Sequence, residues 1–174
     1  MVISHTLRAL RPVRLAVAAA MAFACVTPAT ARDSLGLYGD WGAFRDPATP
    51  RCYAIAKALP STLKRDYQPY ASVGTWPRRS VRNQVHFRMS RKMAAQPRIT
   101  LRVEGKTFEL SGGGGDAWAA DARGNAGILA AMRSASTMTA SATDAQGKRF
   151  SNSWRLPGAA SAMDAAAIGC ARLR

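Results

Sequence analysis

Apolar and polar residues alternate along several short segments of this chain. Residues 81–89 place valine, phenylalanine and methionine on one face of an extended backbone and arginine, glutamine and histidine on the other, with Asn83 as a polar exception. An alternation with period two is typical of a half-buried β-strand. Residues 99–103 and 107–110 repeat the pattern on either side of a Glu-Gly-Lys turn, so they predict a β-hairpin.

Shorter apolar or alternating runs predict four further strands, at residues 52–58, 71–76, 137–143 and 148–156. The last two flank an Asp-Ala-Gln-Gly turn and predict a second hairpin. Glycine and proline are dense in residues 32–51, and prolines bound residues 59–69, so both segments are predicted to be loops. Within the first of these loops, Tyr38 and Trp41 are candidate core residues. The glycine run 112–115 is predicted to be a flexible loop.

Two segments have the periodicity of helices. Asp121 can cap a helix that runs to about residue 135. Ser161 begins a C-terminal helix, on which Met163, Ala167 and Cys170 share one face. The fold class is therefore predicted to be mainly β with two short helices, arranged as an antiparallel β-sandwich or as a curled sheet with the helices packed at one edge.

The first 31 residues have the features of a secretory signal peptide. Three arginines (Arg8, Arg11 and Arg14) precede an apolar run from Leu15 to Val26, and Ala29-Thr30-Ala31 closes the segment. The run is shorter than the roughly 20 residues that a membrane span needs. We expect residues 1–31 to be a cleaved signal peptide and residues 32–174 to form a single domain outside the cytoplasm, in the periplasm or cell envelope. A membrane anchor or a buried helix is the alternative interpretation of the leader.

The chain has three cysteines, and the predicted leader contains one of them, Cys25. In an oxidising compartment, the remaining Cys52 and Cys170 are most simply a disulfide that joins the two ends of the domain. Two free thiols are the alternative. A shared metal ion is disfavoured, because the mature chain has a single histidine and no second cysteine close to either. Residues 22–25 also loosely resemble a lipoprotein processing site, and in that case Cys25 would be lipidated and retained.

The net charge is strongly positive, +15 for the whole chain. Without residues 1–31, 22 basic and 10 acidic residues remain, which gives +12. Residues 78–102 contain eight basic residues and no acid. If residues 81–89 and 99–103 pair as antiparallel strands, their arginines share one face. The candidate binding residues for phosphate or sulfate groups of an anionic partner are Arg78, Arg79, Arg82, Arg88, Arg91 and Arg102. The alternative is a solvated face that protects an edge strand from aggregation.

Several short motifs occur in an order and spacing that resemble one known family. They are Gly39-Asp40-Trp41, Cys52-Tyr53 at the start of a strand, Val103-Glu104-Gly105, residues 128–132, the turn at residues 144–147 and residues 156–162. On these residues the chain is similar to the invasion-associated locus B (IalB) family of Gram-negative bacteria, over nearly all of residues 35–172. The resemblance implies an exported protein. It implies no catalytic residues and no cofactor for this chain. The founding member is linked to entry into red blood cells, but a shared fold does not imply that role.

No residue pattern predicts catalysis. His86 is the only histidine after the leader, no G-x-S-x-G motif presents a serine, and the glycine run lacks the Lys-Ser/Thr of a phosphate loop. We therefore expect a non-enzymatic, exported envelope or periplasmic protein without cofactor or metal, which binds an anionic envelope component or a partner protein rather than a specific nucleic acid. The alternative is a periplasmic hydrolase that uses carboxylates in an unrecognised cleft; His86 beside a serine and an aspartate would also favour an enzyme. Of the tryptophans, Trp118 is the one we expect to be exposed for a partner contact.

Overall fold

The computed structural model describes residues 32–171, and the ten strands in this part of the chain form one antiparallel sheet. Their order across the sheet is β1-β2-β3-β4-β5-β8-β7-β6-β9-β10. The strands are β1 (Asp33–Tyr38), β2 (Trp41–Asp46), β3 (Arg51–Lys57), β4 (Tyr70–Trp76), β5 (Val81–Arg88), β6 (Ile99–Val103), β7 (Lys106–Gly113), β8 (Asp116–Ala119), β9 (Thr137–Thr143) and β10 (Arg149–Arg155). The helices are α1 (Ala122–Met132) and α2 (Ala159–Ala171), and a short 3₁₀ helix, η1 (Pro77–Arg79), joins β4 to β5.

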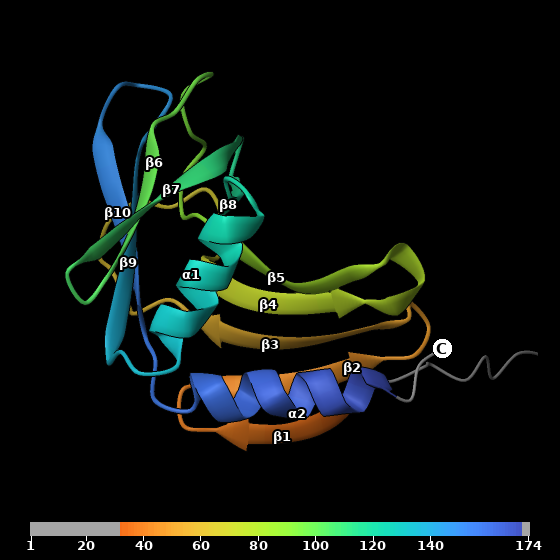
Figure 1. The fold of residues 1–174 in the computed structure, drawn as a ribbon. Coiled ribbons are helices and arrows are strands. Elements are labelled where there is room, and N and C mark those ends of the chain that lie inside the picture. Colours follow the sequence, from red (N-terminus) through yellow and green to blue (C-terminus); the bar gives the residue numbers. More distant parts are fainter. Residues whose placement is uncertain (1–31, 172–174) are drawn as a thin grey trace, which may run out of the picture.

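The sheet is strongly bent, so its two halves form two layers (Figure 1). Strands β1–β5 make one layer, and β6, β7, β9 and β10 stand at a steep angle to it, with α1 beside the junction. The short strand β8 connects the halves, since it pairs with β5 over residues 86–88 and with β7 over residues 110–113. The prediction of a mainly β protein with two short helices is confirmed, and the arrangement is the curled sheet.

Helix α2 covers one face of β1–β4 and is bonded to it covalently (Figure 1). Its apolar side turns Ala162, Met163, Ala166 and Cys170 into the core. Cys170 forms a disulfide with Cys52 of β3, with the two Cα atoms 5.5 Å apart. The predicted disulfide is therefore present, and it joins the second helix to the third strand.

The second half of the sheet packs its inner face on a set of large side chains. Trp154 is fully buried and lies 5.4 Å from Phe87, ring centre to ring centre, so it joins β10 to β5 across the bend. Ile128 and Met132 of α1 fill the space beside them. No helix among the described residues has the length and apolar composition that crossing a bilayer requires.

Three sequence predictions about the fold were wrong in detail. Residues 32–51 contain β1 and β2 rather than a loop, because a bulge at Gly36, with φ +133°, lets a glycine-rich segment continue as a strand. The glycine run is divided between β7 and the turn before β8, a strand that the sequence did not predict. On α2 the buried position is Ala166, and Ala167 is exposed. The predicted leader, with Cys25, lies outside the described residues.

Candidate ligand-binding groove and basic surface

The face of β1–β5 opposite α2 carries a row of side chains that no helix in the described chain covers. Strand register places Leu37, Ile55, Ser72, His86 and Trp118 in one row across the sheet. Neighbouring rows add half-buried aromatic side chains, namely Phe44, Tyr53 and Tyr70. Exposed apolar and aromatic surface of this kind marks ligand or partner sites more often than ordinary exterior.

A groove of about 900 Å³ lies at the β1–β4 end of this face. Phe44, Ile55 and Tyr70 contribute to its lining from the strands, and the segment 58–69 contributes a second side. The described residues include four exposed large aliphatic side chains, and three of them, Leu37, Leu59 and Leu63, line this groove. The groove therefore gathers most of the large aliphatic side chains that the fold leaves in water.

The charged residues that line the groove are mostly basic. They are Lys57, Arg65, Arg155 and one acid, Asp40. Arg155 Nε donates to Asp40 Oδ2 at 3.1 Å, so these two charges neutralise each other. Lys57 and Arg65 have no carboxylate partner among residues 32–171, and they leave the groove with a positive potential.

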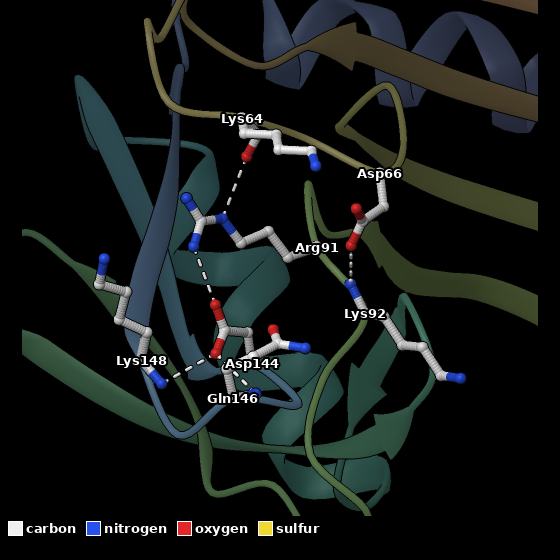
Figure 2. Close-up of polar contacts among 7 residues, drawn as sticks. All are labelled: Lys64, Asp66, Arg91, Lys92, Asp144, Gln146 and Lys148. Carbon is white, nitrogen blue, oxygen red and sulfur yellow. Dashed lines mark hydrogen bonds and ion pairs between the residues drawn. The ribbon is translucent and has the colours of Figure 1, made fainter.

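The segment that forms the second side of the groove is fixed at both ends. The backbone N–H of Leu59 donates to the Ser153 carbonyl of β10 at 2.8 Å. Farther along, Asp66 N–H donates to the Ser90 carbonyl at 2.8 Å. Asp66 Oδ2 accepts from Lys92 N–H at 2.9 Å, as Figure 2 shows. The groove is thus held open by hydrogen bonds to two other parts of the fold.

Arg91 and Asp144 are the centre of that attachment. Arg91 Nη1 donates to Asp144 Oδ2 at 2.8 Å, and Arg91 Nε donates to the Lys64 carbonyl at 3.1 Å (Figure 2). Asp144 Oδ1 accepts the backbone N–H groups of Gln146 and Lys148. The Lys148 N–H, followed by the Arg91 and Gln146 bonds, holds the pKa of Asp144 below its ordinary value despite burial.

The predicted anion-binding arginines separate into three groups. Arg88 pairs with Asp116 and lies 3.9 Å over the ring of Tyr67, and Arg91 pairs with Asp144, so both have structural partners. The expected pairing of β5 with β6 is wrong, because β8 and β7 lie between them. Arg102 on β6 is exposed but does not share a paired strand face with Arg82.

The remaining three, Arg78, Arg79 and Arg82, stay exposed where β4 turns into β5. The end of this hairpin projects away from β6–β10 (Figure 1). Ser80 and Asn83 have φ values of +54° and +48° here, which turn the backbone sharply around the arginines. None of the three arginines forms an ion pair within residues 32–171.

His86 lies between a serine and an aspartate. Its Nε2 is 3.0 Å from Asp116 Oδ1, and its Nδ1 is 3.5 Å from Ser72 Oγ. The imidazole packs against Tyr70 and Trp118, with ring centres 5.6 and 5.1 Å away. Desolvation lowers the pKa of His86, and Asp116 only partly opposes this shift. The expected exposure of Trp118 is not observed, since its ring is half-buried beside His86.

This arrangement lacks two features of a serine hydrolase. Ser72 lies inside β4, paired with β3 on one side and β5 on the other, rather than on a sharp strand-to-helix turn. Backbone amides in such a ladder are committed to sheet hydrogen bonds and are poor oxyanion donors. Asp116 is also shared with Arg88.

Every aspartate in residues 32–171 already has a partner. Six pair with arginine, and two accept a backbone N–H; the six are Asp33, Asp40, Asp46, Asp116, Asp144 and Asp164, and the two are Asp66 and Asp121. A catalytic acid needs a raised pKa, whereas arginine pairing favours the ionised carboxylate. Within residues 32–171, no group of three or more histidine, cysteine or acidic residues lies close enough to hold a metal ion.

No family model, curated protein or solved structure matches the chain. The resemblance to the invasion-associated locus B family therefore stays a prediction.

The groove is not among the sites that the sequence predicts. Leu37 lies in a segment predicted to be a loop, and Leu59 and Leu63 lie in a loop that the sequence did predict. One signal is present in the sequence. Leu59 directly precedes Pro60 and Leu63 follows it, and two leucines are unusual in a charged, proline-bounded loop.

Proposed function

We propose that the protein is an exported, non-catalytic binding protein of the periplasm or cell envelope that docks on phosphate-bearing envelope lipids through the basic end of the β4–β5 hairpin. The observation that carries the proposal is the distribution of charge. Residues 32–171 contain twenty lysine and arginine side chains, of which seven form ion pairs, so thirteen have no carboxylate partner there. The unpaired positive charge is therefore available to an outside partner.

The hairpin end is the favoured docking point because Arg78, Arg79 and Arg82 lie within five residues of one another and are all exposed. Arginine's planar guanidinium suits phosphate oxygens. A basic side chain near an anionic lipid surface contributes about 1 kcal/mol, so three of them account for roughly a hundredfold in affinity.

Vesicle sedimentation tests this proposal with the mature chain. The triple variant Arg78→Glu, Arg79→Glu, Arg82→Glu should lose binding to phosphatidylglycerol vesicles by about a hundredfold or more at low salt. The matched control Arg102→Glu, Lys106→Glu, Arg123→Glu has the same change in net charge elsewhere on the surface. Equal losses in both variants, or binding of the wild type to phosphatidylcholine vesicles at the same level, would refute a docking site at the hairpin end.

A hydrolase is the second candidate, and the contact of His86 with Ser72 and Asp116 is the observation that favours it. A fluorophosphonate probe decides between the two, because it labels activated serines. Labelling of wild type that Ser72→Ala abolishes would contradict a non-catalytic protein. No labelling at Ser72 agrees with a structural role for the His86 contacts.

A further inference from the structure

We propose that the groove between β1–β4 and the segment 58–69 binds the hydrocarbon chain of an anionic amphiphile, a single-chain molecule with a carboxylate or phosphate head. This inference concerns a different surface from the hairpin arginines and does not depend on them. The groove lies on the sheet face that α2 leaves open, and it is not among the sites that the sequence predicted.

Exposed leucines cluster in the groove. A soluble protein scatters its exposed large side chains, whereas here three of the four that residues 32–171 expose line one groove: Leu37, Leu59 and Leu63. The side chains of Phe44 and Ile55 extend this apolar lining along the strands. Covering such an apolar surface with hydrocarbon removes it from water, which is favourable in free energy.

Basic side chains line the same groove. Its one carboxylate, Asp40, is bonded to Arg155, while Lys57 and Arg65 have no carboxylate partner in the described chain. A neutral hydrocarbon would provide no counter-charge for Lys57 and Arg65. An anionic head offers them a partner, and the molecule that combines this head with an apolar chain is an amphiphile.

The shape of the groove agrees with a small occupant. About 900 Å³ lies within the 300–1,000 Å³ typical of small-molecule sites. The hydrogen bonds of Leu59 and Asp66 to other parts of the fold hold its sides apart before any ligand arrives. Little ordering cost therefore opposes binding.

Calorimetry with dodecanoate, below its micellar concentration, tests the proposal on the mature wild-type protein. We expect saturable binding of one dodecanoate per chain, which tightens by up to roughly fourfold for each added methylene in a series of carboxylates. Butyrate, which has the head but not the chain, should show no measurable binding. Absence of saturable dodecanoate binding, or an affinity independent of chain length, would overturn the proposal.

Two pairs of surface variants locate the site. Leu63→Asp should weaken dodecanoate binding by about tenfold or more, while Ile168→Asp, a comparably exposed position on α2 at the opposite face, should leave it unchanged. Lys57→Glu with Arg65→Glu should weaken it similarly, and Arg102→Glu with Lys106→Glu should not. Because all these side chains are exposed, each variant should retain the wild-type melting temperature. Equal effects of a variant and its control would sink the assignment.

The hairpin variant separates this proposal from the proposed function. Arg78→Glu, Arg79→Glu, Arg82→Glu should leave dodecanoate affinity within about twofold, since distant sites act independently. Size-exclusion chromatography adds one more outcome. A dimer of wild type that Leu63→Asp converts to monomer, without any binding of dodecanoate, would overturn the proposal and assign the groove to a second copy of the chain.

Discussion

Arg91 and Asp144 lie 53 residues apart in the sequence, and their side chains form an ion pair of 2.8 Å that is largely shielded from water. The same guanidinium reaches the Lys64 carbonyl, so one side chain joins the β9–β10 turn to the segment that forms a side of the groove. An arginine that the sequence suggested as an anion ligand is thus already occupied by an internal anion.

Replacing Asp144 with asparagine should lower the free energy of unfolding at pH 7. The folded pKa of Asp144 is depressed, mainly by the Lys148 N–H. A depressed carboxyl contributes stability that is present above the unfolded pKa of about 3.9 and lost as the pH falls through the folded value. The difference between wild type and Asp144→Asn should therefore shrink below about pH 4. Urea unfolding at pH 7 and pH 3 measures it.

Glu109→Gln serves as the control for that experiment, because Glu109 is exposed and makes no side-chain hydrogen bond or ion pair within the described residues. Its stability should match that of wild type at both pH values. A loss for Asp144→Asn that stays constant down to pH 3 would contradict the assigned role of its ionised form.

Removing the disulfide should destabilise the protein substantially. The bond between Cys52 and Cys170 closes a loop with a sequence separation of 118, and loop-closure entropy for that length corresponds to about 4–5 kcal/mol as an upper figure. Cys52→Ala with Cys170→Ala should therefore shift the urea midpoint strongly. In dithiothreitol, wild type should approach the variant. Two reactive thiols in the air-oxidised native protein would be inconsistent with this bond.

Gly158→Ala should be far more harmful than an alanine at another left-handed glycine. Gly158 has φ +88°, and a Cβ there would lie 1.7 Å from the Tyr38 carbonyl oxygen, so the turn before α2 would have to move. Gly105 has φ +81°, and a Cβ there would meet nothing within 4 Å, which makes Gly105→Ala the matched control. The control should cost about 1 kcal/mol. Thermal melting of both variants isolates the effect of the contact, and equal losses would disprove it.

His86 should titrate below the ordinary histidine value. Its burial disfavours the imidazolium and lowers its pKa, so the unfolded chain takes up a proton at higher pH than the native one. The free energy of unfolding should then fall as the pH drops from about 7 through 6.5 towards the folded pKa, and His86→Gln should lack this slope. The chain has two histidines, His5 and His86, so ring proton shifts that are absent from the His86→Gln spectrum belong to His86, and their NMR titration reports its pKa directly.

Asp116→Asn provides the second half of that test. Asp116 raises the pKa of His86 through a hydrogen bond and through its charge, against the dominant effect of burial. Removing the charge should lower the histidine pKa further. A native pKa at or above 6.5 would show that the ring is more solvated than its contacts with Tyr70 and Trp118 imply.

Local alternation predicted the strands that have one buried and one solvated face. Residues 137–143 form β9 with the bounds expected from the sequence, because every second side chain is small or apolar and turns inward. Residues 33–38 were missed, since an edge strand with a glycine bulge has no clean period. The four residues of β8 were missed because a strand this short has too few side chains to establish a period.

The candidate groove could not be predicted from local sequence patterns, for a different reason. Its lining comes from β1–β4, from the segment after β3 and from β10, and only strand register brings Leu37 beside Ile55 through Gly42. The prediction that Arg82 and Arg102 share one strand face was wrong for the same reason. Nothing near either residue in the sequence indicates that β8 and β7 separate their strands. Pairing order between distant strands is the information that periodicity does not contain.

Helix α2 follows all ten strands of residues 32–171, yet it covers the strands that come first among them. Strands β1–β4 therefore keep an alanine-lined face open until residues 159–171 pack on it. A chain that ends before residue 159 would leave this face of β1–β4 uncovered and Cys52 without its disulfide partner Cys170. The thirteen residues of α2 are therefore needed to cover the first layer of the sheet, although they come last in the described chain.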